Sequence, residues 1–248
     1  MTTLSQTIPE SYGSDFLHTI DQLLRDVPGV LQRIRDARDL ATLARAMIVT
    51  IVAGAGIFGA SMGAYRGGLQ VLYAGLKLPL ALLLTTAVCA PSLTALNAAL
   101  GRQACIRRDL SLLLASLART SLVLAAQAPM VLLAVRMGVS YHAIILLVVA
   151  CCAAGAVVGL SLLLRGLRTS DAGPVLAVAL ALLTVFGFVG SQMSWTLRPF
   201  VLRPRTPEPT FVRSLEGSFF EAVVTSSMSA RGVYWRSSAP LPGEEDVR

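Results

Sequence analysis

The sequence predicts an all-α protein, a polytopic transmembrane helix bundle with about five spans. Hydrophobic residues make up 54% of the 248 residues and charged residues only 14%, whereas roughly a quarter of the residues in soluble domains are charged. The apolar residues occur in long blocks, and between Leu40 and Gly173 the only acidic residues are Asp109 and Asp171. Apolar stretches of about 18 or more residues with few charges are typical of transmembrane helices. The chain is therefore expected to lie in a lipid bilayer.

The first 46 residues differ from the rest. Residues 1–14 are polar, and we expect them to be disordered. Within 15–46 the apolar residues recur at alternating spacings of three and four, the period of amphipathic helices; they are Leu17, Ile20, Leu24, Val27, Leu31 and Ile34. Pro28 interrupts this period but is tolerated in the first turn of a helix, so two short helices should meet near Asp26–Gly29. They either lie on the membrane surface or under the bundle, or they bind a soluble protein partner.

Five apolar segments then form the expected bundle, residues 47–195. Each is close to the ~20 residues that a spanning helix needs; they cover residues 47–65, 78–100, 110–135, 142–164 and 173–195.

Two regions outside these segments are irregular in composition. The link 66–77, RGGLQVLYAGLK, is too apolar for a loop, yet too short and too charged at its ends to span. We expect it to form an interfacial or re-entrant helix that leads into the second segment. The tail, residues 196–248, is rich in proline and arginine, and five of the twelve prolines lie between 199 and 240. Because proline interrupts helices, we expect a mostly irregular tail.

Small residues recur every four positions in two of the segments. The first contains Gly59 and Gly63, and the fourth contains Gly155 and Gly159. Small residues at this spacing allow two helix backbones to approach closely in lipid. The pattern predicts helix packing within one subunit or in a homo-oligomer.

Arg119 lies near the middle of the third segment, LLASLARTSLVLAAQAPM. Arginine at a helix centre costs about 2.5–3.5 kcal/mol on insertion scales, and such residues usually face the bundle interior or water. By helical spacing Ser116, Thr120 and Gln127 share its face. With Asn97, these residues are the candidate pore-lining or intramembrane polar group: Arg119, Thr120, Gln127 and Asn97.

Two roles for Arg119 follow from this position. It lines an anion path, or it ties the bundle together by bonding to other groups of the protein. As a tie, it would bond to backbone carbonyls, to hydroxyls or to one of four candidate acidic residues, Asp109, Asp171, Glu216 or Glu221.

Several classes of function find no support in the sequence. The two histidines, His18 and His142, are near no nucleophile motif, and no catalytic motif is present, so we expect no enzyme. The four cysteines have no zinc-ligand spacing, so we expect no metal and no cofactor. The net charge of +7 comes from arginines next to the apolar blocks rather than from a basic patch with aromatics. We therefore expect no nucleic-acid partner.

The arginines also bear on location. Twenty of the 21 basic residues are arginine, which is typical of a GC-rich bacterial genome and predicts a bacterial inner-membrane protein. Positive charge concentrates on the cytoplasmic side of membrane proteins, and the first helix usually dominates orientation. Four arginines precede the first expected span within 33–45, so we expect the N-terminus in the cytoplasm.

Three stretches carry a resemblance. GGLQVLYAGLKLPLALLL, APSLTALN and the tail SWTLRPFV…EGSFFEAV resemble a group of uncharacterised bacterial inner-membrane proteins. The five-span plan after a polar, helical N-terminus is similar in architecture to the Yip1-type membrane proteins, over roughly residues 45–195. The resemblance implies a helical fold without a catalytic site.

Taken together, these observations predict a non-enzymatic integral membrane protein. The first hypothesis is a pore- or channel-type or transport-associated subunit. The alternative is a membrane scaffold or signalling protein that recruits a soluble partner through residues 15–46.

Overall fold

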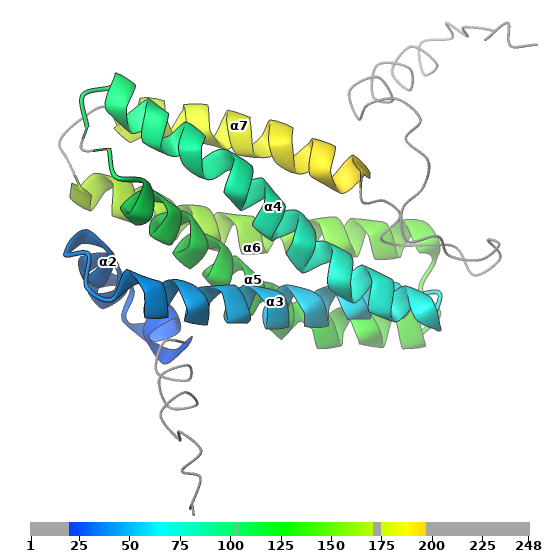
Figure 1. Ribbon diagram of the computed structural model, residues 1–248. Helices are drawn as coiled ribbons and strands as arrows, with labels where there is room; N and C mark the ends of the chain where they lie inside the picture. Colours follow the sequence, from blue (N-terminus) through cyan, green and yellow to red (C-terminus); the bar gives the residue numbers. More distant parts are fainter. Residues whose placement is uncertain (1–19, 103, 171–174, 197–248) are drawn as a thin grey trace, which may run out of the picture. The chain divides into compact units, whose positions relative to one another are not determined.

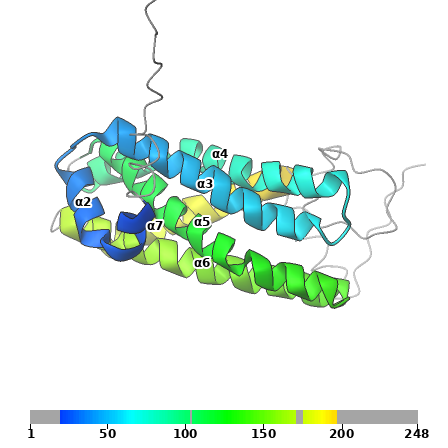
Figure 2. The same ribbon diagram turned by 90° about the horizontal axis from the view of Figure 1, so that it is seen from below.

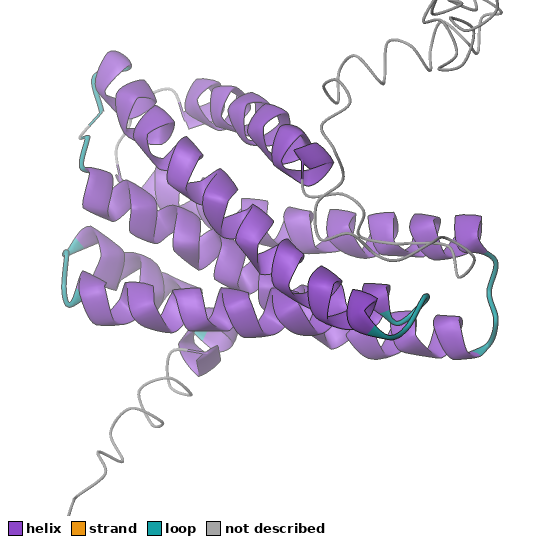
Figure 3. Ribbon diagram, turned by 45° about the vertical axis from the view of Figure 1, so that its right-hand side comes forward, coloured by secondary structure: helices purple, strands orange, loops and turns teal. Residues whose placement is uncertain are grey.

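A computed structural model describes residues 20–102, 104–170 and 175–196. Helices make up the regular structure of these residues, and none of them lies in a strand (Figure 3). The predictions for the disordered residues 1–14 and the irregular tail after Thr196 lie outside the described residues.

The described chain forms a helix bundle (Figure 1). A helical segment at residues 20–25 is followed by six helices: α2 (Val27–Arg35), α3 (Leu40–Gly63), α4 (Leu69–Ala99), α5 (Ile106–Arg136), α6 (Tyr141–Ser170) and α7 (Val175–Thr196). Five of them, α3 to α7, are long and apolar enough to cross a membrane. The predicted class, an all-α bundle with about five spans, is confirmed.

The link at 66–77, predicted as an interfacial or re-entrant helix leading into the second segment, is helical from Leu69 on and continuous with the second span. The 31 residues of α4 form one continuous helix that begins at Leu69 and includes Pro79. In its first turns Leu69, Leu72 and Leu76 are exposed, whereas Gln70, Ala74 and Lys77 are buried; both sets repeat at helical spacing. This stretch therefore has an exposed apolar side and a packed side, and its one charged residue, Lys77, lies on the packed side.

The first span also begins earlier than predicted. Helix α3 starts at Leu40 rather than at residue 47. Arg45 is exposed on this helix, and a long arginine side chain near a helix end can extend its charge to the membrane surface. A charge at this position therefore does not end the helix.

The short N-terminal helices cover one end of the bundle. They meet at Asp26, whose side chain accepts a hydrogen bond of 3.0 Å from the Gly29 backbone N–H and so caps α2. Leu24 is exposed, but the other large apolar side chains are buried against α5 and α6; they are Leu23, Val27, Val30, Leu31 and Ile34. Figure 2 shows α2 at the end where α3 begins and α6 finishes. We call this the capped end. The position of the short helices agrees with the prediction that they lie under the bundle.

The spanning helices pack unequally. Helix α3 packs against both α4 and α5, α5 also packs against α6, and α7 packs mainly against α4. Buried apolar residues form one cluster toward the capped end and a second toward the opposite end. Among the described residues, α7 contributes to the first cluster only, through Val178, Ala179 and Leu182.

Candidate functional site: polar groups inside the bundle

Arg119 lies about 20 Å along α5 from its first residue, at 1.5 Å per residue. The preceding run, residues 111–118, is buried throughout, and Arg119 itself is half-buried. Its Nη1 atom is buried and has no hydrogen-bond partner among the described residues. The predicted tie to a carbonyl, hydroxyl or carboxylate is therefore not made by this nitrogen in the described part of the chain.

A second guanidinium lies toward the capped end on the neighbouring helix. Arg165 of α6 lies within electrostatic range of Arg119 and repels it. Side chains on a helix lean toward its N-terminus, and α5 and α6 run in opposite directions. Arg119 therefore leans toward the capped end and Arg165 away from it. The two side chains thus lean toward each other, and like charges in this arrangement favour an anion near them.

The hydroxyl groups near Arg119 bond to the neighbouring helix. Ser116 Oγ donates to the Gly159 carbonyl at 2.8 Å, and Thr120 Oγ1 donates to the Gly155 carbonyl at 3.2 Å. Both are buried in the α5–α6 contact. Thr120, predicted as a candidate pore residue, therefore lies in a helix contact together with the two glycines that the sequence marked for packing.

The structure does not bring Asn97 to Arg119. Asn97 Nδ2 donates to Asp109 Oδ1 at 3.1 Å, and both residues are buried near the capped end. Asp109 precedes Arg119 by ten residues, or about 15 Å along α5. Asp109, the only acidic residue in the described parts of the five spans, is therefore engaged with Asn97 and does not neutralise Arg119.

Gln127 and Lys77 are polar groups of the opposite half. Gln127 is half-buried, and its Oε1 atom has no hydrogen-bond partner among the described residues. Lys77 is fully buried on α4, and sequence reasoning missed it by assigning residue 77 to the link. The sequence did offer a signal, because Gln70, Ala74, Lys77 and Ala81 follow one another at helical spacings of three and four. In the structure these residues form one buried face of α4.

Gly59 and Gly63 of α3 face the backbone of α4. A Cβ atom added at Gly59 would collide with the Ala74 carbonyl oxygen, and one added at Gly63 would collide with the Gln70 carbonyl oxygen. The Val71 Cα would also lie 2.7 Å from the added atom at Gly63. At these points the α3 and α4 backbones are in direct contact, as small residues at this spacing allow.

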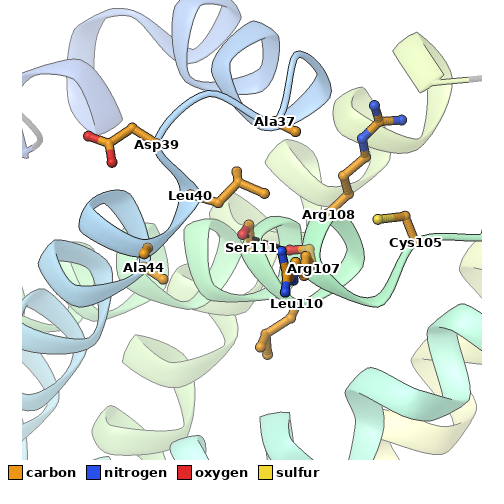
Figure 4. A pocket seen from close by; sticks show the side chains of 10 residues that line it. Ala37, Asp39, Leu40, Ala44, Cys105, Arg107, Arg108, Leu110 and Ser111 are labelled. Atoms are coloured by element: carbon orange, nitrogen blue, oxygen red, sulfur yellow. Dashed lines mark hydrogen bonds between the residues drawn. The ribbon is translucent and has the colours of Figure 1, made fainter.

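Two hollows lie at the capped end. The larger, about 950 Å³, lies between the beginnings of α3 and α5 and includes Cys105, Arg107 and Arg108. In Figure 4 the Asp39 carboxylate points away from the Arg108 guanidinium. The smaller, about 440 Å³, lies between α2 and α6 and contains Arg35, Arg165 and Arg168. Arginines at both hollows suit negatively charged groups.

The described residues contain no group of three or more His, Cys, Asp and Glu side chains that could hold a metal ion. Their buried polar side chains are hydroxyls, amides, Lys77, Arg102 and one acid, Asp109, and further arginines lie at the capped end. No family model, no curated protein and no solved structure matches this chain, so the resemblance to bacterial inner-membrane and Yip1-type proteins stays a prediction.

Proposed function

We propose that this chain is a non-enzymatic membrane subunit of the pore or transport-associated kind, and that Arg119 binds an anion within the bundle. The observation that supports the proposal is the buried Nη1 of Arg119, which has no partner among the described residues. A buried polar group without a partner costs about 1–3 kcal/mol, and a charged group costs more. A bound anion or water would remove that cost.

The charge balance inside the bundle favours an anion over a cation. Arg119 and Lys77 both lie within the spans. The only described acidic residue of the spans, Asp109, bonds to Asn97 near the capped end. A cation path would need carboxylates or carbonyls directed toward it, whereas guanidinium and ammonium groups attract anions. Gln127 adds a further polar group, while Thr120 is occupied by the contact with α6.

The arginines support a cytoplasmic location for the capped end. Ten described arginines lie there: Arg25, Arg33, Arg35, Arg38, Arg45, Arg102, Arg107, Arg108, Arg165 and Arg168. The opposite end has two, Arg66 and Arg136. Under the positive-inside rule, this agrees with an N-terminus inside and an inner-membrane location. Labelling of a cysteine placed at Gly68 by an impermeant reagent added outside intact cells is expected; labelling only after lysis would contradict the orientation.

The scaffold alternative receives less support from the packing. The apolar side of residues 20–35 is buried in the bundle, so a soluble partner would have to bind the charged outer side, where Arg25 and Asp21 form an exposed ion pair of 2.9 Å. If the intact protein retained a soluble partner that the paired substitutions Asp21→Arg and Arg25→Asp released, the scaffold function would replace the proposal.

The test compares Arg119→Gln and Arg119→Leu with wild type in two measurements, anion flux into liposomes and thermal stability. If Arg119 binds an anion, Arg119→Gln should keep the melting temperature within a few degrees and reduce anion flux or change its anion preference. Arg119→Leu removes the cost of a charge at a helix centre, about 2.5–3.5 kcal/mol, so its stability should stay equal or rise while flux falls.

Arg136→Gln serves as the matched control, because Arg136 is exposed at the far end of the same helix. It should leave both flux and stability unchanged. Two results would overturn the proposal. Both Arg119 variants could melt well below wild type with flux retained, as a structural tie would predict. Alternatively, both could match wild type in stability and flux.

A further inference from the structure

We infer that the hollow between α2 and α6 binds the phosphate headgroup of an anionic phospholipid; we call it the basic hollow. Its volume of about 440 Å³ falls within the roughly 300–1,000 Å³ typical of small-ligand sites. Three arginines line it, Arg35 from α2 and Arg165 and Arg168 from α6, and none of the described residues that line it is acidic.

Close packing of α2 on α6 brings these arginines together. A Cβ atom added at Gly166 would collide with Leu112 of α5 and would lie 3.1 Å from Leu31 Cδ2 of α2. Gly166 thus lets Leu31 pack directly onto α6, between the positions of Arg165 and Arg168. Arg35, one turn after Leu31, is then held beside the α6 arginines.

Only one of the two arginines of α2 lines the basic hollow. Arg33 Nη1 donates to Gln22 Oε1 at 2.8 Å, so Arg33 is directed toward residues 20–25 rather than toward α6. Arg35 lines the hollow instead. The three guanidiniums therefore form a local group built by two helices, rather than a general coating of the capped end.

The basic hollow lies at the end of a candidate span, where lipid phosphates are expected. Arg168 is the last residue of the α6 span, and Arg165 lies one turn further in. Basic pockets at the ends of transmembrane helices bind anionic lipid headgroups, and guanidinium binds phosphate oxygens in pairs. Val27 and Leu31 add apolar lining, which suits a glycerol backbone and the first methylenes better than it suits a free, fully hydrated phosphate.

This inference does not rest on the anion proposed at Arg119. Arg165 contributes to both regions, so the test leaves Arg165 intact and substitutes Arg35 and Arg168. The full-length protein in neutral detergent is titrated with short-chain phosphatidylglycerol, with phosphatidylcholine of the same chain length, and with inorganic phosphate. Because a ligand that binds only the folded state raises stability, the melting temperature reports binding.

Phosphatidylglycerol should raise the melting temperature in a saturable way, and phosphatidylcholine and inorganic phosphate should raise it much less. In Arg35→Gln/Arg168→Gln the half-saturating concentration of phosphatidylglycerol should increase at least about tenfold, since each charged hydrogen bond lost contributes about that factor or more. Arg45→Gln is the matched control. It removes an exposed arginine near the same end and should keep the wild-type titration.

Three results would overturn the inference. Inorganic phosphate could reproduce the whole effect, which would indicate a site for a soluble anion. Arg45→Gln could weaken binding as much as the double variant, which would indicate general charge attraction. The double variant could also bind as wild type does. If it fails to fold, Arg35→Lys/Arg168→Lys keeps the charge but loses the paired geometry, and native mass spectrometry should count less retained phosphatidylglycerol than in wild type.

Discussion

The α3–α4 and α5–α6 contacts are both made by glycines four residues apart, yet they differ in what the glycines face. Gly59 and Gly63 lie against the backbone of α4. Gly159 instead lies against the Thr120 hydroxyl and the Ser116 carbonyl of α5, and both hydroxyls of this contact donate to α6 carbonyls. A glycine stripe in the sequence therefore marks where two helices come close, while the partner helix decides whether the contact is backbone packing or hydrogen bonding.

The largest effect is expected at the α3–α4 contact. Gly59→Leu or Gly63→Leu would place a branched side chain where even a Cβ atom collides with backbone, and backbone cannot rotate away. We expect a loss of at least about 3 kcal/mol of folding free energy, at or beyond the upper part of the range for overpacking, with a broad or aggregated peak in size-exclusion chromatography.

Gly187→Leu is the control for these substitutions. Gly187 lies in α7, and a Cβ atom added there would meet no atom within 4 Å. The control should elute and melt like wild type. If Gly59→Leu and Gly63→Leu also melted like wild type in detergent, the α3–α4 backbone contact would not exist as described.

A smaller effect is expected at the α5–α6 contact. In Gly159→Ala the new Cβ collides with Thr120 Oγ1, which is the end of a side chain and can rotate at the expense of its bond to Gly155. The expected loss is about 1–3 kcal/mol, measured by thermal or denaturant unfolding.

A second substitution tests whether the Thr120 hydroxyl is the group that the new Cβ atom meets. Thr120→Ala in the Gly159→Ala background removes the colliding hydroxyl, so the double variant should lose less stability than the sum of the two single losses, as neighbours in contact do. The Ser116 carbonyl, 2.9 Å from the added Cβ, should prevent full recovery. Strict additivity of the two losses would mean that Thr120 and Gly159 do not touch.

The spans could be predicted from the sequence because burial in lipid demands long apolar blocks, and those blocks are visible residue by residue. The helix ends could not be predicted in the same way. Lys77 looked like the end of a link, because an isolated charge lowers the hydropathy of any window that contains it. Only the packing of α3 and α4 shows that position 77 is buried within a helix.

The candidate polar site was harder to predict than the fold. Helical spacing placed Arg119, Thr120 and Gln127 on one face of α5, but it could not show that Thr120 bonds to α6 or that Asn97 bonds to Asp109. These pairs come from different helices, so their geometry depends on how the helices cross. The convergence of Arg35, Arg165 and Arg168 was missed for the same reason, since α2 and α6 are far apart in the sequence.

The smallest effect is expected from the α5 hydroxyls themselves. Thr120→Val keeps the volume of the side chain and removes its hydrogen bond to the Gly155 carbonyl. Hydrogen bonds between transmembrane helices contribute about 0.6 kcal/mol on average, because the separated helices also find partners. We therefore expect Thr120→Val to lower the melting temperature by only about 1–2 °C, and Ser116→Ala to act similarly.

Thr184→Val is the control, because Thr184 Oγ1 donates to the Leu180 carbonyl of its own helix and is exposed; it should change stability less. If Thr120→Val instead lowered the free energy of unfolding as much as Gly159→Ala does, the hydroxyls rather than the close approach of the helices would hold α5 to α6. The α3–α4 and α5–α6 contacts would then differ in their main source of stability as well as in their chemistry.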